Sequence, residues 1–368
     1  ILHTLPRESM LVASSSSVFQ RLSTPMQRRF LSSNLAEKLG RGTRGSGGRS
    51  SVSGVVATVF GSTGFLGRYT VHRLGRIGSQ VVIPYRGDEH DYRHLKVMGD
   101  LGQIVPVAFQ PRDYDSIMNS VANSNVVINL MGKHYETKNF SFEDVHVDIA
   151  RMVAKAARET GTTRLIHVSA MGAKHDSPSE FLRTKAAGEK AVLQEFPNAT
   201  ILRPSYMFGS EDNFLNTLAT VARSLHVMPL LSGGTARMQP VYVGDVADSI
   251  LECVLNPGTD GKLFELGGPQ VVRLQEVIDF VAFVTERKPL NLPIPAFVAK
   301  LYAAILEKVP FPIITRDMIA RLQTPCVASQ GSLGLEDLSL TPTDLHKAVY
   351  FLRRYRKGGG SSDINMQT

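Results

Sequence analysis

Three glycines at intervals of three residues are the first part of the sequence with an evident chemical use. Gly61, Gly64 and Gly67 stand in the stretch GSTGFLG, directly after the apolar run 55–60. Such a β-branched run predicts a buried parallel strand, and glycines at its end permit a tight turn, close approach to a pyrophosphate and close packing of a helix. Residues 68–78 predict that helix, with its first N–H groups directed at the phosphates. The predicted contacts of this dinucleotide site are Gly61, Thr63, Gly64, Phe65, Leu66 and Gly67.

A basic residue ends the next predicted strand. Residues 80–85 are followed by Arg86, about 20 positions beyond the glycines. An acidic residue near this point would bind a ribose 2′-hydroxyl, whereas arginine favours a 2′-phosphate. The sequence therefore favours NADP(H) over NAD(H). Because Asp88 and Glu89 lie close by, a solvated surface arginine is the alternative.

Strand and helix patterns alternate beyond this point. Predicted strands cover 104–109, 125–132, 164–170 and 199–209, and predicted helices cover 113–122, 144–161 and 181–195. This order predicts an α/β fold: a Rossmann-type doubly wound parallel sheet with a smaller carboxyl-terminal lobe. Ligands bind outside the carboxyl ends of such strands. The predicted site therefore also includes Leu130, Met131, Gly132, Ser169 and Pro204.

The helix 181–195 carries the most informative pair of residues. Phe181 and Lys185 are four positions apart, so that they share one helix face and can reach one ligand. An ammonium group can bind a ribose or exchange a proton. A phenyl ring can neither give nor take one.

These motifs resemble the extended and atypical short-chain dehydrogenase/reductase family. GSTGFLG, NLMG, RPSYMFG, QPVYVGDVADSI and FELGGP carry the resemblance over about residues 55–290. Active members use a serine, a tyrosine and a lysine, and the tyrosine transfers the proton. The corresponding positions hold Ser169, Phe181 and Lys185, so the resemblance implies that the proton donor is missing.

Three side chains could replace the missing phenol. Tyr206 is expected to serve packing, Lys185 to bind the nicotinamide ribose, and His134 to be an exposed loop histidine. We therefore assign no catalytic residue and no metal ligand. The alternative is an active NADPH-dependent reductase or epimerase that uses Lys185 or Ser169 on a small carbonyl substrate. A third possibility is a sensor whose partner affinity depends on the nucleotide form.

A closer resemblance extends over nearly the whole chain. VVINLMGKHYETKNFSFEDV, MGDLGQIVPV and FLRRYRKGG are similar to a family of nucleotide-binding accessory subunits of mitochondrial respiratory complex I. The resemblance implies NADP(H) held as a structural ligand and a role in assembly or stability. It also implies other complex I subunits as partners, at the junction of the matrix arm and the membrane arm. The implied location is the matrix side of the inner membrane, peripherally bound.

The positive charge is concentrated at the amino terminus. Residues 1–54 hold eight basic and two acidic residues, which account for most of the net charge of +8, so we expect no nucleic-acid partner. Residues 10–33 are rich in serine and arginine and have no acid, which predicts a transit peptide, with Met10 as a possible start and a flexible lead-in up to residue 54. Cys253 and Cys326 have no metal-ligand spacing and are expected in the core.

The remaining domains are expected at 55–235 for nucleotide binding and 236–357 for the lobe, with some strands interleaved and a flexible tail at 358–368. Asp245 is predicted to cap a helix.

Residues 289–312 hold an apolar helix that is too short to span a bilayer. We expect this helix either in the core or against a partner or the inner-membrane lipid. The basic end at 353–357 could touch acidic lipid or a neighbouring subunit, or complement the end of its own helix.

Overall fold

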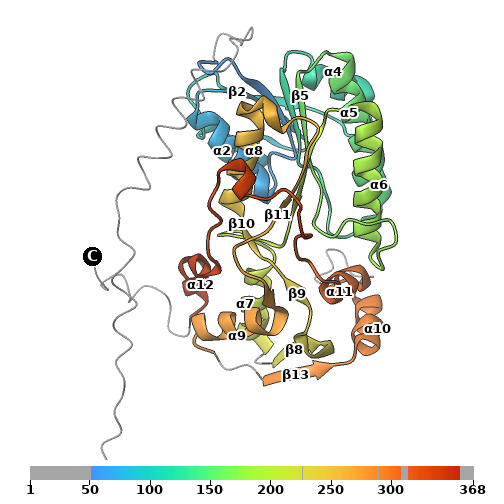
Figure 1. Cartoon of the computed structure of the whole chain (residues 1–368), viewed down its shortest axis with the longest axis vertical. Helices are drawn as coiled ribbons and strands as arrows, with labels where there is room; N and C mark the ends of the chain where they lie inside the picture. Colours follow the sequence, from blue (N-terminus) through green and yellow to red (C-terminus); the bar gives the residue numbers. More distant parts are fainter. Residues whose placement is uncertain (1–50, 226, 288–289, 308–313, 357–368) are drawn as a thin grey trace, which may run out of the picture. The chain divides into compact units, whose positions relative to one another are not determined.

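A computed structural model describes residues 51–225, 227–287, 290–307 and 314–356 (Figure 1). The predicted transit peptide, nearly all of the lead-in and the tail at 358–368 lie outside these residues. The same holds for Lys357 and for parts of the apolar segment 289–312.

A seven-stranded sheet forms the upper part of the molecule in Figure 1. Its strands are β1 (Val56–Phe60), β2 (Gln80–Tyr85), β3 (Ile104–Ala108), β4 (Val126–Asn129), β5 (Arg164–Val168), β6 (Thr200–Pro204) and β11 (Leu263–Leu266). The order is β11-β6-β5-β4-β1-β2-β3, and every pairing is parallel. From β1 the chain continues to β2 on one side, whereas β4 pairs with β1 on its other side. The strand order therefore reverses between β1 and β4, which makes this position the switch point of the doubly wound fold. The predicted fold class is confirmed.

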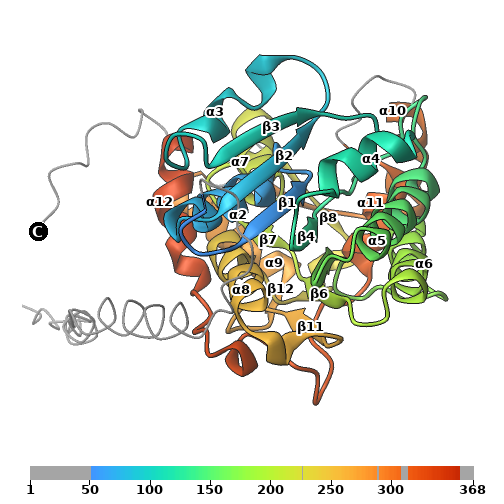
Figure 2. The same ribbon diagram turned by 90° about the horizontal axis from the view of Figure 1, so that it is seen from above.

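Helices cover both faces of this sheet (Figure 2). One layer holds α2 (Phe65–Arg76), α3 (Arg93–Lys96) and α8 (Val243–Leu255), and the other holds α4 (Tyr114–Val121), α5 (Ile149–Glu159) and α6 (Glu180–Glu195). Successive residues of a strand point to opposite faces, so Val59 packs in the first layer and Phe60 in the second. Both side chains are fully buried.

Two predicted segments are divided in the structure, and part of the sheet layer comes from the carboxyl-terminal half of the chain. The run 199–209 is divided into β6 and β7 (Met207–Phe208), and β7 pairs with β10 (Val241–Tyr242) instead of with the main sheet. A π-helical turn at Asp144–Asp148 precedes α5. The seventh strand, β11, comes from beyond residue 235, as does α8, which packs against α2.

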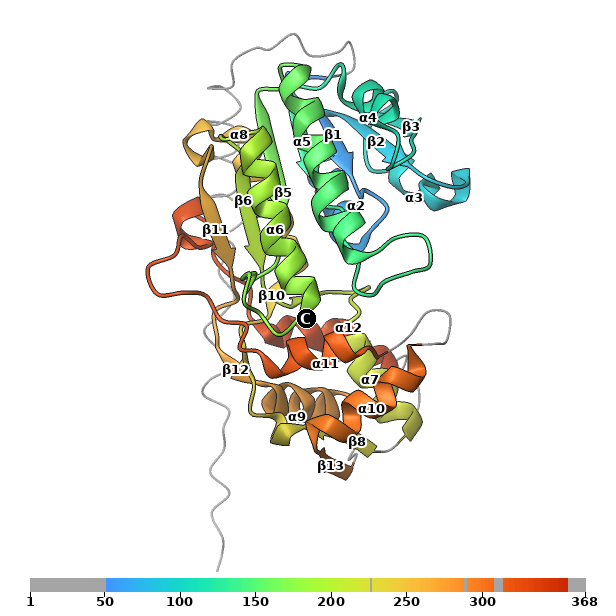
Figure 3. The same ribbon diagram turned by 90° about the vertical axis from the view of Figure 1, so that its right-hand side faces the viewer.

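The remaining strand pairs and α-helices lie beyond the carboxyl ends of the strands (Figures 1 and 3). Two small strand pairs are β8 (Val227–Leu231) with β13 (Leu290–Ile294) and β9 (Arg237–Met238) with β12 (Val272–Arg273). The helices are α7 (Leu215–Leu225), α9 (Leu274–Val284), α10 (Ala296–Leu306), α11 (Arg316–Gln323) and α12 (Ala348–Leu352). Short 3-10 turns occur at Glu89–Asp91, Ser232–Gly234, Pro257–Thr259, Glu336–Leu338, Leu345–Lys347 and Arg353–Tyr355.

The predicted helix cap at Asp245 is wrong. The helix begins directly after β10, with Tyr242 at the N-cap and Asp245 already in the first turn. Its carboxylate accepts hydrogen bonds from the N–H of Thr343 at 2.6 Å and from the hydroxyl of Thr343 at 2.8 Å. Asp245 therefore anchors the carboxyl-terminal segment to the sheet layer.

The two cysteines differ in burial. Cys253 is fully buried on α8, as predicted. Cys326 is half-buried, with its Sγ 3.4 Å from the Oγ of Ser205, so the expectation of a core position holds only partly.

The apolar helix α10 is largely uncovered. Ala303 is buried, but Phe297 is 73% exposed, Leu301 68% and Ile305 63%. Core burial, one of the two expectations for this segment, is therefore wrong for these side chains. No helix within the described ranges is both long and apolar enough to cross a membrane.

The basic carboxyl-terminal segment is bound to its own chain. Arg354 donates hydrogen bonds to the carbonyl of Ser210 and the side-chain oxygen of Asn216. Arg356 donates to the carbonyl of Val284. These bonds attach the segment to α7 and α9.

Candidate nucleotide-binding site

The glycine turn after β1 has the close packing that the sequence predicts. Gly61 has a φ of +77°, and a Cβ there would lie 3.1 Å from the backbone of Leu130. A Cβ at Gly67 would lie 2.4 Å from the carbonyl oxygen of Gly61 and 2.5 Å from that of Ser62. Only glycine lets α2 pack so closely on the turn.

The start of α2 is open to an anion. Its N-cap is Gly64, which offers no side chain to bind the first N–H groups, and no acid lies in the first turn. The Oγ of Ser62 is buried and has no hydrogen-bond partner among the described residues. Unpaired N–H groups at a helix start favour a phosphate, and a buried hydroxyl without a partner calls for a ligand. These groups fit the pyrophosphate of a dinucleotide.

The loop after β4 is held against this turn. The N–H of Leu130 donates to the carbonyl of Phe60 at 3.0 Å, and the N–H of Met131 donates to Oδ1 of Asn129 at 3.0 Å. The turn and the predicted residues Leu130, Met131 and Gly132 thus lie together at the switch point of the sheet.

Lys185 reaches the same place from α6. Its Nζ donates to the carbonyl of Val168 at 3.1 Å, and a Cβ at Gly132 would lie 3.2 Å from this Nζ. Burial lowers the pKa of Lys185 to about 8, against the smaller opposing effect of Glu189. The Oγ of Ser169 is buried nearby on the same strand end and has no partner among the described residues. Both groups could bind the ribose of a nicotinamide nucleotide.

The side chain of Phe181 lies in a cluster of phenyl and imidazole rings. It is 6% exposed and contacts Phe142, His134 and His146, with ring centroids 6.0, 6.0 and 5.1 Å away. His146 accepts a hydrogen bond at Nε2 from the N–H of Lys133. Burial, reinforced by the charge of Lys185, lowers the pKa of His146 to about 2, so this imidazole remains neutral.

Helix α11, from the carboxyl-terminal part of the chain, packs against α6 (Figure 3). The guanidinium carbon of Arg321 lies 4.4 Å from the centroid of the Phe181 ring. Oδ1 of Asp317 accepts hydrogen bonds from the hydroxyl of Ser179 at 2.8 Å and from the N–H of Glu180 at 2.7 Å. The helix that carries Phe181 and Lys185 is thus capped by α11.

The sequence gives no signal for this cover. Asp317 and Phe181 are 136 residues apart, and TRDMIARL indicates only a surface helix with a threonine cap. Arg321 and Asp317 are therefore site residues that the sequence reasoning missed.

Tyr206 and His134, the other two candidate proton donors, differ in their surroundings. Tyr206 is half-buried and stacks on Phe214 at 5.0 Å, as expected of a packing residue, and burial raises its pKa. His134 is exposed in its loop, as expected, but its ring also stacks on that of Phe181 at 6.0 Å, and partial desolvation there lowers its pKa to about 4. Pro204 ends β6, where its carbonyl accepts from the N–H of Met171.

The side chains of the remaining predicted contacts are divided between site and core. Thr63 and Phe65 are half-buried, and the ring of Phe65 meets Tyr69 edge-on at 5.8 Å. Leu66 is buried in the core beneath α2, so only its backbone can face a ligand. Arg86 is exposed at the end of β2, 5.5 Å from the centroid of the Phe140 ring.

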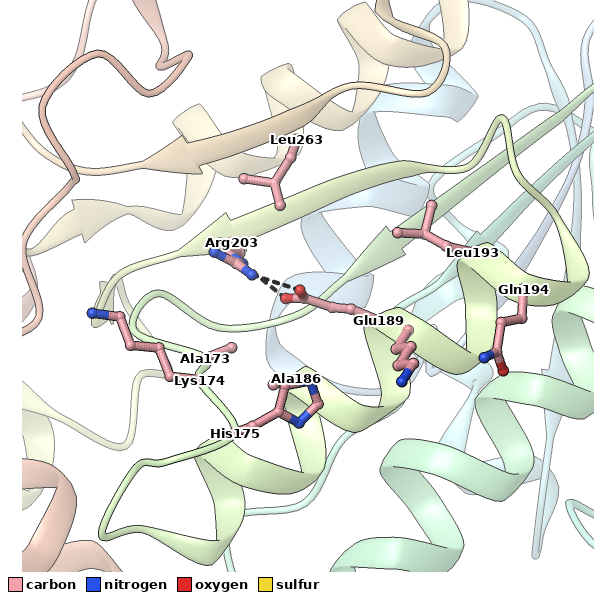
Figure 4. A pocket seen from close by; sticks show the side chains of 10 residues that line it. Ala173, Lys174, His175, Ala186, Glu189, Leu193, Gln194, Arg203 and Leu263 are labelled. Carbon is pink, nitrogen blue, oxygen red and sulfur yellow. Dashed lines mark hydrogen bonds and ion pairs between the residues drawn. The ribbon is translucent and has the colours of Figure 1, made fainter.

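A separate hollow of about 520 Å³ lies between α6, β6 and β11 (Figure 4). The side chain of Arg203 binds both carboxylate oxygens of Glu189, at 2.9 and 2.7 Å, and contacts Glu265 at 3.4 Å. None of the predicted contacts lines this hollow. The ion pairs join α6 to two strands, which indicates a structural role.

The comparisons with known proteins agree with this geometry. Residues 57–267 match the NAD dependent epimerase/dehydratase family. A rat protein, subunit 9 of the NADH dehydrogenase [ubiquinone] 1 alpha subcomplex, mitochondrial, is 49% identical over 85% of this chain and 83% of its own length. The Arabidopsis thaliana protein of the same name is 48% identical over 86% of this chain and 82% of its own.

Solved structures show the same fold at low identity. An NADPH-dependent quinone oxidoreductase of Escherichia coli, solved with NADPH, has a TM-score of 0.65 and 17% identity, covering 80% of this chain and 99% of its own. The family match covers more than half of the chain, and the mitochondrial relatives align over most of their own length. The chain therefore belongs to the NAD dependent epimerase/dehydratase family, in the branch formed by subunit 9 of the alpha subcomplex of mitochondrial NADH dehydrogenase (ubiquinone).

Proposed function

We propose that this chain is a non-catalytic, NADP(H)-binding accessory subunit of mitochondrial complex I. It would lie peripherally on the matrix side of the inner membrane, at the junction of the matrix arm and the membrane arm. Its role would be the assembly or stability of the complex. The observation that carries the proposal is the phenyl ring of Phe181, covered by Arg321 at 4.4 Å, at the position of the proton donor.

The residues present fit a bound dinucleotide. Backbone N–H groups after Gly61 and at the start of α2 would hold the pyrophosphate, and Lys185 with Ser169 would hold the nicotinamide ribose. A nicotinamide cofactor supplies a hydride, and reduction of a carbonyl also requires a proton at the oxygen. Phe181 provides no such proton, and Arg321 occupies the space above its ring.

A nucleotide that is held and not consumed can still act through stability. A ligand that binds only the folded state raises the free energy of unfolding by about 2.7 kcal/mol at a hundredfold excess over its Kd. Because the site joins β1, β4 and α6, this gain would act on the whole sheet.

The exposed face of α10 supports attachment to a larger assembly. Phe297, Leu301, Tyr302 and Ile305 are each at least 60% exposed, and Leu290 on the neighbouring strand β13 is 67% exposed. A contiguous apolar face of this kind marks a contact site in a water-soluble domain. The face suits another subunit of the complex or the surface of the inner-membrane lipid.

Native gel electrophoresis of mitochondria followed by mass spectrometry tests location and partnership together. The proposal expects the chain to migrate with complex I and to carry one tightly bound NADP(H). A chain that migrates alone would contradict the proposed membership.

One observation favours the alternative of an active reductase. Lys185 is buried at the site, and its pKa of about 8 would let it exchange a proton near neutral pH. Steady oxidation of NADPH by the purified chain with a panel of carbonyl compounds would support this alternative.

A further inference from the structure

The hollow beside α6 is a surface that the nucleotide site does not use (Figure 4). Its volume is about 520 Å³, and its lining comes from α6, β6, β11 and the loop after β5. Helix α6 contributes Ala186, Glu189, Lys190, Leu193 and Gln194, which recur at helical spacing. One face of a regular helix therefore forms a wall of the hollow.

The buried charged groups of the hollow are already paired. Arg203 binds both carboxylate oxygens of Glu189, and it also contacts Glu265 at 3.4 Å. Glu265 in turn accepts a hydrogen bond from the N–H of Ser329 at 2.7 Å. The side chains of Glu189 and Glu265 are only 8% and 6% exposed. These ion pairs hold α6 against the two strands, so the walls of the hollow are fixed before anything binds.

Apolar side chains leave space between these walls. Leu193 reaches the hollow from α6 and is 37% exposed, and Leu263 reaches it from β11 and is half-buried (Figure 4). Ala173 and Ala186 are buried and too small to fill the space. An apolar side chain inserted here would lose its contact with water, which favours binding by about 25 cal/mol per Å² of apolar surface.

Two lysines beside this apolar space keep their positive charge unpaired. Lys174, in the loop after β5, and Lys190, on α6, are both exposed, and neither forms an ion pair with a described residue. The nearby acid Glu195 pairs with Arg158 at 2.7 Å, and the exposed Asp176 forms no ion pair with either lysine. Both ammonium groups are therefore available to carboxylates from outside the chain.

This distribution of polarity matches a protein interface better than a small-molecule pocket. A small ligand is oriented by a few polar groups that converge inside its pocket. Here the inner polar groups, Arg203 and Glu189, bind each other, and the unpaired charges are exposed at the edge. A protein interface has an apolar centre and a polar, solvent-accessible rim. Cations at that rim favour a partner surface with acidic residues.

We propose that the hollow is a second docking site of this chain, distinct from the α10 face, for an acidic segment of a neighbouring subunit. An apolar side chain of that segment fills the space between Leu193 and Leu263, and carboxylates on either side of it pair with Lys174 and Lys190. The inference rests on the proposed membership of complex I. Nucleotide binding does not depend on the hollow, because none of the predicted nucleotide contacts lines it.

Charge reversal tests the role of the two lysines. The full chain with Lys174→Glu and Lys190→Glu is expressed in mitochondria that lack the natural chain, and native gels measure how much of it is found in complex I. Like charges facing the acidic segment should lower this amount by about tenfold. Lys174→Arg with Lys190→Arg keeps the charge and should be incorporated normally. Normal incorporation of the glutamate variant would overturn the proposal.

Lys138→Glu with Lys262→Glu is the matched control. Both lysines are exposed, neither lines the hollow, and the change of charge is the same. This variant should be incorporated like the natural chain, and an equal loss of both double variants would overturn the assignment to the hollow. Urea unfolding of the purified variants should give equal midpoints, which separates loss of docking from loss of folding.

Zero-length cross-linking of intact complex I identifies the occupant. A carbodiimide joins a lysine amine to a carboxylate that is in contact with it, and mass spectrometry locates the link. We expect Lys174 or Lys190 to be linked to an aspartate or glutamate of another subunit. A link to a second copy of this chain, or no link from either lysine, would overturn the proposal. Absence of the natural chain from complex I would instead contradict the proposed function, so the two failures are distinguishable.

Discussion

The guanidinium of Arg321 lies over the face of Phe181, 4.4 Å from the ring centroid, and joins two helices that are far apart in the sequence. At the position where active relatives place a proton donor, this chain has a phenyl ring, and an arginine from α11 covers it. The phenyl ring and its cover by Arg321 are separate features, and both support the proposed absence of catalysis.

Phe181→Tyr is therefore expected to leave the chain without turnover. The side chain at this position is only 6% exposed and is covered by Arg321, so a carbonyl substrate would have little access to the new hydroxyl. The measurement is NADPH oxidation with a panel of carbonyl compounds, and Phe142→Tyr serves as the control because it adds the same hydroxyl to the neighbouring ring. Steady turnover by Phe181→Tyr alone would mean that the phenol is all the site lacks.

Asp317→Ala should destabilise the folded chain by about 3 kcal/mol, as expected when one partner of a largely buried charge network is removed. The variant loses hydrogen bonds from Ser179 and Glu180 and leaves Arg321, 3.6 Å away, without its carboxylate. Urea unfolding measures the change. For comparison, Lys155→Gln removes an exposed pair with Glu159 and should cost at most about 0.5 kcal/mol. Equal costs for both variants would contradict the capping role of Asp317.

Gly67→Ala should damage both stability and nucleotide binding. The added Cβ would lie 2.4 Å from the carbonyl oxygen of Gly61, so α2 must move away from the turn, at a cost of about 3 kcal/mol or more. Gly334→Ala is the control, because its Cβ would lie 3.8 Å from the nearest heavy atom. Thermal unfolding with and without NADPH reports both effects, and a Gly67→Ala variant that binds NADPH normally would refute the tight turn.

The free energy of unfolding should depend on pH because the ammonium group of Lys185 is buried. Its pKa is about 8 in the folded chain against 10.5 for an ordinary lysine. Between these values the unfolded chain binds the extra proton, so the free energy of unfolding contributed by Lys185 rises with pH, by about 3 kcal/mol across the window. Below pH 8 the full penalty remains.

The measurement is the difference between the natural chain and Lys185→Met, unfolded by urea at several pH values without nucleotide. Cys253, whose pKa burial raises to about 12, contributes in the opposite direction, but equally in both chains, so it cancels. A difference that does not change between pH 8 and 10.5 would show that Lys185 is not desolvated.

Substitutions on the exposed face of α10 should impair incorporation into complex I but leave NADPH binding unchanged. Leu301 and Ile305 are 68% and 63% exposed, so Leu301→Asp with Ile305→Asp should change the free energy of unfolding by about 0.5 kcal/mol or less. We expect this variant to bind NADPH normally and to be lost from complex I on native gels. Lys300→Ala, on the same helix, is the control, and normal incorporation of the double variant would exclude this face as the contact.

The sequence predicts the strand, glycine turn and helix of the candidate site because the signals for these elements are local. The glycines and the run 55–60 are adjacent, and the four-residue spacing of Phe181 and Lys185 fixes a shared helix face. The predicted strands at 80–85 and 104–109 agree with β2 and β3 within one residue. The alternation of predicted strands and helices then indicates that the sheet is parallel and covered by helices.

The cover over Phe181 could not be predicted in the same way. It depends on tertiary contacts between α11 and α6, which no local spacing encodes. The error at Asp245 has a related origin: an aspartate at a helix start favours a cap, but here its carboxylate binds Thr343, 98 residues away.

The central claim is that the chain binds NADPH without catalysing its oxidation. The most direct test is to measure whether NADPH bound to the purified chain is oxidised. We predict that NADPH stays bound and reduced, with no oxidation above background in the presence of a carbonyl panel. Steady turnover at an ordinary enzymatic rate, about 1 s⁻¹ or faster, would contradict the account.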